Sequence, residues 1–208
     1  MSITPASASH HGRSHGPLEY RDPHQAVKIT GFWIFLATDM LLFGCLFATY
    51  LVLRTHTDGG PTAAHLFDVP GFTAETFALL TSSFTGGLAT LAMRNGNRKW
   101  VMIWMVLTML LGLTFIGLEV QEFVADVGQG ATAHRSAFLS AFYTLVGTHG
   151  THVSIGLIWM LLTLIQIARR GLTAKTARKL FVVNLYWHFL DVVWVFIFTI
   201  VYLSGVVM

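Results

Sequence analysis

Five long apolar stretches fill nearly all of this 208-residue chain, and they limit what the chain can fold into. Each holds about 20 or more residues, enough for a helix to cross the ~30 Å hydrocarbon core of a bilayer. Hydrophobic residues make up 54% of the chain and charged residues only 11%, which is typical of a membrane protein. We therefore predict an all-α integral membrane protein, a bundle of five transmembrane helices in one domain, 28–208. The predicted spans are 28–54, 70–94, 99–124, 136–168 and 178–206.

Basic residues are distributed unevenly among the connections. Eleven of the thirteen Lys and Arg residues lie in three places: the predicted tail at 1–27 with its junction to the first span, the connection at 94–99, and the connection at 169–179. The other two are Arg54 and Arg135. Cytoplasmic segments of membrane proteins are enriched in Lys and Arg. The pattern predicts a cytoplasmic N-terminus and a C-terminus on the periplasmic or extracellular side.

The first 27 residues are polar and rich in histidine, with His10, His11, His15 and His24. A His-rich tract can bind metal, but this spacing is irregular, and we interpret the segment as a flexible tail. The net charge of +3 is explained by the basic connections and gives no sign of nucleic-acid binding. The single cysteine, Cys45, lies within the first apolar stretch, which rules out disulfides within the chain.

Ionisable side chains occur deep inside every apolar stretch. Such a group costs roughly 2.5 to 3.5 kcal/mol at the bilayer centre on insertion scales, so it normally faces protein partners. These groups are Asp39, Glu75, Glu119, Glu122, His149, His152, His188 and Asp191, with Gln121 beside them. They are expected to mark the inward faces of the helices.

Six of these residues form pairs at a spacing of three: Glu119 with Glu122, His149 with His152, and His188 with Asp191. Each pair projects from one helical face. Four interpretations stay open: a di-iron-like metal site, a haem held by two histidines, a polar network that joins the helices, and a proton-conducting chain. The Glu-x-x-His motif of di-iron bundles is absent, and we expect no metal site.

Asp39 differs from the other buried acids because its own stretch offers aromatic and aliphatic neighbours and no basic partner. Unless another helix supplies a cation or a donor, burial favours the neutral acid. A carboxyl group of this kind is a functional candidate, and a structural buried acid fits the pattern equally well.

Several motifs together resemble subunit III of the haem-copper terminal oxidases, from about Ile29 to Gly205. They are Thr38-Asp39, Gly117-Leu118-Glu119 through Glu122-Phe123, Gly147-Thr148-His149-Gly150-Thr151-His152-Val153 and Trp187-His188-Phe189-Leu190-Asp191-Val192-Val193-Trp194. Five spans, Gly59-Gly60-Pro61-Thr62 and Ala168-Arg169-Arg170-Gly171-Leu172-Thr173 look most like the bacterial quinol oxidase branch, particularly the cytochrome bo type.

The resemblance implies an accessory subunit of a quinol oxidase that pumps protons and reduces oxygen to water in the bacterial inner membrane. Haems and copper are then expected in the partner subunit I, with subunits II and IV as further partners and no cofactor in this chain. Subunit III of the family supports proton uptake and catalytic lifetime, and Asp39 matches its buried acid near the proton-uptake side. In the family, subunit III holds phospholipid in a cleft, and the five-span form lacks the two helices that make one wall of this cleft. Arg169 and Arg170 are candidates for lipid phosphates.

Two alternatives of other classes remain open at this point: a proton-linked transporter or channel, and a haem-binding membrane cytochrome. A visible spectrum distinguishes the cytochrome, and copurification with a large haem-bearing partner distinguishes the transporter. The electron donor, quinol or cytochrome c, follows only from the resemblance, because its site would lie on another subunit.

Overall fold

The computed structural model describes residues 23–57 and 69–207, and every regular element in these ranges is helical. The elements are α1 (Pro23–Leu53), α3 (Val69–Arg94), α4 (Arg98–Gly128), α5 (Ala137–Arg170), α6 (Ala174–Ile197), the π-helix η2 (Phe198–Leu203) and α7 (Ser204–Val207). Within the described ranges, five helices are long and apolar enough to cross a membrane. The prediction of an all-α protein with five such helices is confirmed, and the orientation of the termini stays a prediction.

Helix ends differ from the predicted ones where local chemistry extends a helix. The first helix begins at Pro23, inside the predicted tail, because proline is compatible with the first position of a helix. The last long helix begins at Ala174 because Thr173 and Thr176 form a reciprocal capping box that satisfies free N–H groups. The remainder of the tail and the segment 58–68, with the Gly59–Thr62 motif, lie outside the described residues.

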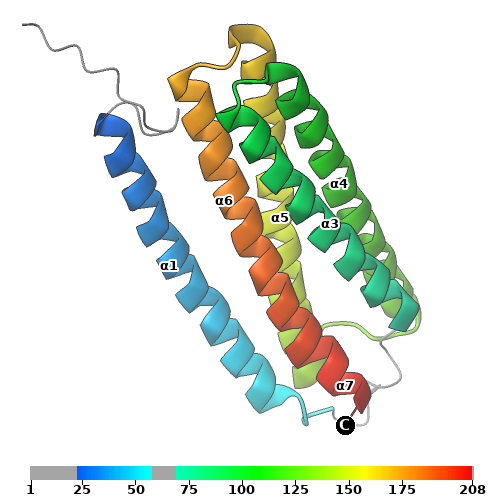
Figure 1. Cartoon of the computed structure of the whole chain (residues 1–208). Helices are drawn as coiled ribbons and strands as arrows, with labels where there is room; N and C mark the ends of the chain where they lie inside the picture. Colours follow the sequence, from blue (N-terminus) through cyan, green and yellow to red (C-terminus); the bar gives the residue numbers. More distant parts are fainter. Residues whose placement is uncertain (1–22, 58–68, 208) are drawn as a thin grey trace, which may run out of the picture.

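Four helices, α3 to α6, pack together, and α1 lies along one side of them against α5 and α6 (Figure 1). One narrow stripe of α1 is buried, with Ile29, Leu36, Phe43 and Tyr50 each seven residues apart. A seven-residue repeat keeps the same helix face toward a neighbour over two turns. Apart from Asp39, most other residues of α1 from Thr30 to Leu53 are exposed, and most of these are apolar, as expected for a helix that faces lipid or another subunit.

The centre of the four-helix bundle is built around the indole of Trp187 on α6. A Cβ atom at Gly112 of α4 would lie 2.7 Å from the Trp187 ring, and one at Gly156 of α5 would lie 3.3 Å from it. Only glycine leaves room for the ring at such close approach. The small residues of the predicted spans thus allow a large aromatic residue to sit between three helices.

Both basic connections lie at the same end of the bundle as the start of α1 (Figure 1). The guanidinium of Arg98 at the start of α4 donates a hydrogen bond of 2.6 Å to the carbonyl of Ala168 near the end of α5. This bond satisfies a carbonyl in the last turn of α5 and ties the two connections together. The shared end agrees with the predicted cytoplasmic grouping of the basic segments.

Candidate functional site

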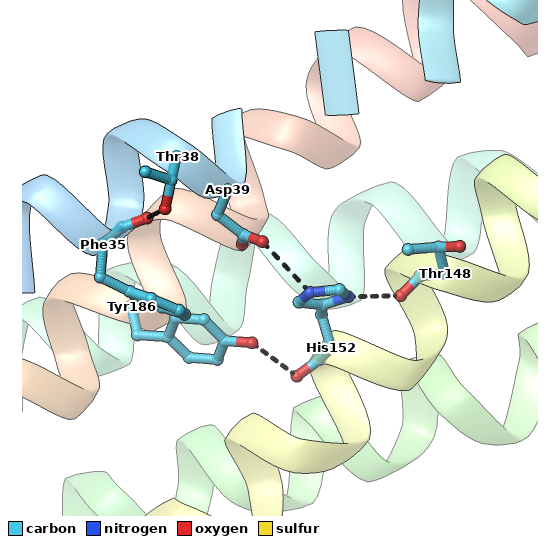
Figure 2. A network of polar contacts seen from close by, with 6 residues as sticks. All are labelled: Phe35, Thr38, Asp39, Thr148, His152 and Tyr186. Carbon is cyan, nitrogen blue, oxygen red and sulfur yellow. Dashed lines mark hydrogen bonds and ion pairs between the residues drawn. The ribbon is translucent and has the colours of Figure 1, made fainter. Parts of the chain in front are cut away.

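Asp39 of α1 meets His152 of α5 inside the interface between these two helices. The carboxylate Oδ1 lies 3.3 Å from the imidazole Nε2, and the two side chains are only 7% and 20% exposed (Figure 2). The ring of Phe43, one turn along α1, packs edge-on against the same imidazole with 5.3 Å between ring centroids. Another helix therefore supplies the partner that the first apolar stretch lacks.

The backbone of α5 fixes which nitrogen of His152 carries a hydrogen. Nδ1 lies 2.7 Å from the carbonyl oxygen of Thr148, and because a carbonyl only accepts, Nδ1 must donate (Figure 2). Nε2 is then either bare, facing a protonated Asp39, or protonated, facing a carboxylate. In both cases one proton lies between the two groups. The geometry therefore allows a hydrogen bond between Oδ1 of Asp39 and Nε2 of His152.

Tyr186 of α6 joins the third helix to this pair. Its hydroxyl donates a hydrogen bond of 3.3 Å to the carbonyl of His152 (Figure 2). The Thr38 hydroxyl instead bonds to the carbonyl of Phe35 in its own helix, at 2.7 Å, so it takes no direct part in the Asp39 contact. The pair is thus held by α1, α5 and α6 together.

His149 occupies a different environment from His152, although both rings pack around Phe43. Its side chain is 0% exposed and lies among the rings of Phe43, Phe115 and Trp194, with centroid separations of 6.3, 5.9 and 5.4 Å. Neither ring nitrogen has a hydrogen-bond partner within the described residues. This imidazole therefore packs as an aromatic ring at the junction of α1, α4, α5 and α6.

Three acids from two helices form a second buried group: Glu75 of α3 with Glu119 and Glu122 of α4. Glu75 is 1% exposed and Glu119 is 3% exposed, and Glu75 interacts electrostatically with both of the others. Tyr202 of η2 lies next to Glu122 and packs against Phe72 of α3 with ring centroids 5.1 Å apart. A π-helix has a wider turn than an α-helix, and such segments are frequent at functional sites.

Gly150 determines how Glu119 fits against α5. A Cβ atom at this position would lie 2.7 Å from both carboxylate oxygens of Glu119. The carboxyl group therefore rests directly on the α5 backbone, in space that only glycine leaves open. The glycine in the Gly147–Val153 motif and the acid in the Gly117–Phe123 motif are parts of one contact.

His188 and Asp191 of α6 are connected through Ser83 of α3. The hydroxyl Oγ lies 2.6 Å from Nδ1 of His188, and the same hydroxyl bonds to the carboxyl group of Asp191. With Asp191 ionised, the hydroxyl donates to it and accepts from the imidazole N–H. The sequence spacing placed the two side chains on one helix face, and in the structure the Ser83 hydroxyl bonds to both of them.

The hydroxyl groups of α3 are the functional partners that sequence reasoning missed. The indole N–H of Trp187 donates to Ser82 at 2.9 Å, and that of Trp194 donates to Thr76 at 3.0 Å. The side-chain amide of Asn184 on α6 donates hydrogen bonds to the carbonyl of Gly86 and to the hydroxyl of Thr90, both on α3. The available signal was the run of Ser and Thr within the second apolar stretch, since small hydroxyl residues often join membrane helices.

No group of three or more His, Cys, Asp or Glu side chains in 23–57 and 69–207 is placed to hold a metal ion. Arg169 and Arg170 lie exposed in the last turn of α5, before the Gly171 cap with its positive φ of 73°. Basic residues in this position are favourable for the helix dipole, whatever else they bind.

The cytochrome c oxidase subunit III family model matches residues 23–206. The chain belongs to this family. A relative named quinol oxidase subunit 3 from Bacillus spizizenii is 52% identical over 195 residues, which cover 94% of this chain and 96% of the relative. A cytochrome c oxidase subunit 3 from Bacillus sp. strain PS3 is 52% identical, with 86% and 87% covered. A cytochrome bo(3) ubiquinol oxidase subunit 3 from Pseudomonas aeruginosa is 49% identical, with 85% of each chain covered.

Family membership, together with the five apolar helices, identifies the chain as a multi-pass membrane protein and a subunit III of haem-copper oxidases. This confirms the resemblance read from the sequence. Within the subunit III fold, the motifs that carry the resemblance come together in space. Asp39, the His149–His152 segment and the Glu119 segment all lie around Phe43, Phe115 and Gly150.

Proposed function

We propose that this chain is the non-redox accessory subunit III of a proton-pumping quinol oxidase in the bacterial inner membrane. In this role it binds subunit I, which carries the haems and copper, and assembles with subunits II and IV. It sustains proton uptake by subunit I and the stability of the complex. This proposal is supported by the names of relatives that align with most of the chain. These relatives are subunits of oxidases, and several are named as quinol oxidase subunits.

One observation carries the proton-related part of the proposal: Oδ1 of Asp39 lies 3.3 Å from Nε2 of His152, whose Nδ1 bonds to the Thr148 carbonyl. Such a pair exchanges its proton without any large movement, because Nδ1 stays bonded to the backbone while the proton moves between Oδ1 and Nε2. At the edge of subunit I, it would hold a proton close to the uptake path. General acid–base groups of this kind act only where water or a partner group can reach them.

The remaining buried polar groups are assigned a structural role in this proposal. Glu75, Glu119 and Glu122 join α3 to α4, and Gly150 lets Glu119 contact α5. His188 and Asp191 join α6 to α3 through Ser83. In a bilayer, interhelical polar contacts of this kind contribute about 0.6 kcal/mol each on average, so many are needed to hold the bundle. Arg169 and Arg170 are proposed to bind lipid phosphates at the end of α5.

The electron donor is assigned to quinol on the names of the relatives alone. A cytochrome c oxidase subunit 3 has the same 52% identity over a somewhat shorter stretch, so the alternative is a cytochrome c oxidase complex. Purifying the complex through a tag on this chain, in mild detergent, and comparing oxygen consumption with ubiquinol and with reduced cytochrome c distinguishes the two. Oxidation of cytochrome c alone would overturn the quinol assignment.

The role of Asp39 is tested in the intact complex reconstituted into vesicles. Asp39→Asn should leave the haem spectrum unchanged while lowering the proton yield per oxygen or shortening activity during sustained turnover. The matched control is Asp126→Asn, a change at another buried acid, near the far end of α4. Equal proton yields and lifetimes in the wild type and both variants would reduce the Asp39–His152 pair to a packing contact.

A further inference from the structure

A groove lies between α1 and α6, which run side by side (Figure 1). Its volume is about 390 Å³, and it is lined by Trp33, Leu36, Ala37 and Met40 of α1 and by Leu185, His188, Phe189 and Val192 of α6. Trp33, Met40 and Val192 are about half exposed, so the groove opens to the surroundings of the bundle. The lining is hydrophobic except for His188, its one ionisable residue.

The imidazole of His188 is held with one edge toward the bundle and the other toward the groove. Its Nδ1 lies 2.6 Å from the Ser83 hydroxyl of α3, which also bonds to Asp191. The second ring nitrogen, Nε2, forms no hydrogen bond with any residue that the structure describes, and it is not among the enclosed polar atoms either. His188 therefore presents an unused hydrogen-bonding atom to the groove.

This atom lies near the middle of the predicted membrane span. His188 is at the centre of the span Ala174–Leu203, and Met40 is at the centre of the span Ile29–Leu53, whereas Trp33 is near the start of that span. Neither water nor lipid headgroups are present at the centre of a bilayer to bond to a polar atom. An occupant that satisfies Nε2 must therefore bring its own polar group to this depth.

The hydrogen bonds around Ser83 determine which kind of polar group fits. With Asp191 ionised, the Ser83 hydroxyl donates to the carboxylate and accepts from Nδ1–H of His188, which leaves Nε2 without a hydrogen. A bare ring nitrogen accepts a hydrogen bond. The occupant therefore needs an O–H or N–H donor on an otherwise apolar body.

We propose that this groove binds an isoprenoid quinol, with a ring hydroxyl donating to Nε2 of His188. Its aromatic head lies against Phe189, and its isoprenoid tail lies in the hydrocarbon of the bilayer. A phospholipid acyl chain carries no donor at this depth and would leave Nε2 unpaired, which costs free energy. Quinol binding to this chain goes beyond the proposed function, on which it rests only for placing the bundle in a membrane that contains quinols.

The test uses the intact oxidase complex in nanodiscs under argon, so that quinols stay reduced. The probe is a ubiquinol analogue with a diazirine in its tail, and mass spectrometry locates the labelled peptides after illumination. Peptides that contain 33–40 and 185–192 should be labelled, and excess ubiquinol should displace the label. Ubiquinol dimethyl ether has the same tail but no O–H donor, so it should need a concentration about two to ten times higher.

Two variants test the site itself. Ala37→Phe fills the groove without changing the bond between His188 and Ser83, so it should abolish the labelling of both peptides. Ala48→Phe is the matched control, because it makes the same change at another exposed alanine of α1, outside the groove, and should leave the labelling unchanged. His188→Phe keeps an aromatic ring without Nε2 and should lower the labelling about two- to tenfold.

Equal displacement by ubiquinol and its dimethyl ether in the wild-type complex would overturn the proposal, as would labelling that Ala37→Phe leaves unchanged. Phosphatidylcholine with a diazirine in its acyl chain is the second probe. If it labels the same peptides and excess ubiquinol does not displace it, the groove holds an acyl chain instead. Crosslinking of a photoreactive residue at Trp33 to another subunit would replace the quinol with a protein interface. Oxygen consumption tests the electron donor separately, so the two proposals can fail independently.

Discussion

The Asp39 carboxyl group and the His152 imidazole lie 3.3 Å apart although α3 and α4 separate them in the chain. Replacing Asp39 with leucine leaves Nε2 of His152 buried without a partner, whereas asparagine can still donate a hydrogen bond to it. We expect Asp39→Leu to weaken retention of the subunit in the complex by about 1–3 kcal/mol and Asp39→Asn to weaken it much less. Thermal dissociation of the purified complex measures both. Equal losses would show that the contact is not made.

The same pair should be visible by infrared spectroscopy. A carboxyl group that bonds to an imidazole should give a carboxyl or carboxylate stretching band that Asp39→Asn removes. His152→Gln should remove or shift the same band, because the partner of the carboxyl group changes. A carboxyl band that is identical in the wild type and in His152→Gln would contradict the one-proton arrangement.

Gly150→Ala should destabilise the subunit through a clash with Glu119. Overpacking of this kind typically costs about 1–3 kcal/mol. Gly147→Ala is the control in the same helix, because a Cβ atom there would meet only a Phe123 ring carbon at 4.0 Å. Adding Glu119→Ala to Gly150→Ala should restore part of the lost thermal stability. A Gly150→Ala variant as stable as Gly147→Ala would mean that the acid does not rest on α5.

Ser83 should couple His188 and Asp191 energetically. In a double-mutant cycle of Ser83→Ala and His188→Leu, we expect a coupling free energy of about 0.5–3 kcal/mol in subunit retention, because each change removes the same hydrogen bond. Ser82→Ala with His188→Leu is the control, since Ser82 bonds to Trp187 instead. Additive effects in both cycles would show that His188 is held by a partner other than Ser83.

The predicted orientation can be tested by cysteine labelling in a variant that lacks Cys45. A cysteine at Gly96 in the α3–α4 turn should be protected from an impermeant reagent in right-side-out membranes, whereas one at His134 should react. The physical reason is the concentration of Lys and Arg in the connections on the Gly96 side. Reaction of the cysteine at position 96 would contradict the predicted orientation and favour the opposite one.

The sequence predicted the helices well because their signal is local. Length and apolarity decide a membrane span residue by residue, and the structure has five helices long and apolar enough to span within the described residues. Helix ends were less accurate: the capping box at Thr173 extends α6 toward its start, and Pro23 begins α1 earlier than expected.

The partners within the site were harder to predict because they depend on how helices rotate against each other. The sequence identified Asp39 and His152 separately, but their contact arises only from the packing of α1 on α5. A spacing of three placed His188 and Asp191 on one helix face, but the sequence did not identify Ser83 of α3 as the hydroxyl that bonds to both. Polarity of one residue marks a buried face, whereas the identity of its neighbour depends on the tertiary structure.

The seven-residue repeat on α1 has a consequence for the Asp39–His152 contact. Because Ile29, Leu36, Phe43 and Tyr50 are all apolar and evenly spaced, shape alone allows α1 to slip along α5 by seven residues, about 10 Å, and still fill most of the same positions. Asp39 has no equivalent seven residues away: Phe32 and Leu46 occupy those sites. Only one longitudinal position of α1 brings a carboxyl group to His152, so this single pair selects one docked arrangement from several of similar shape.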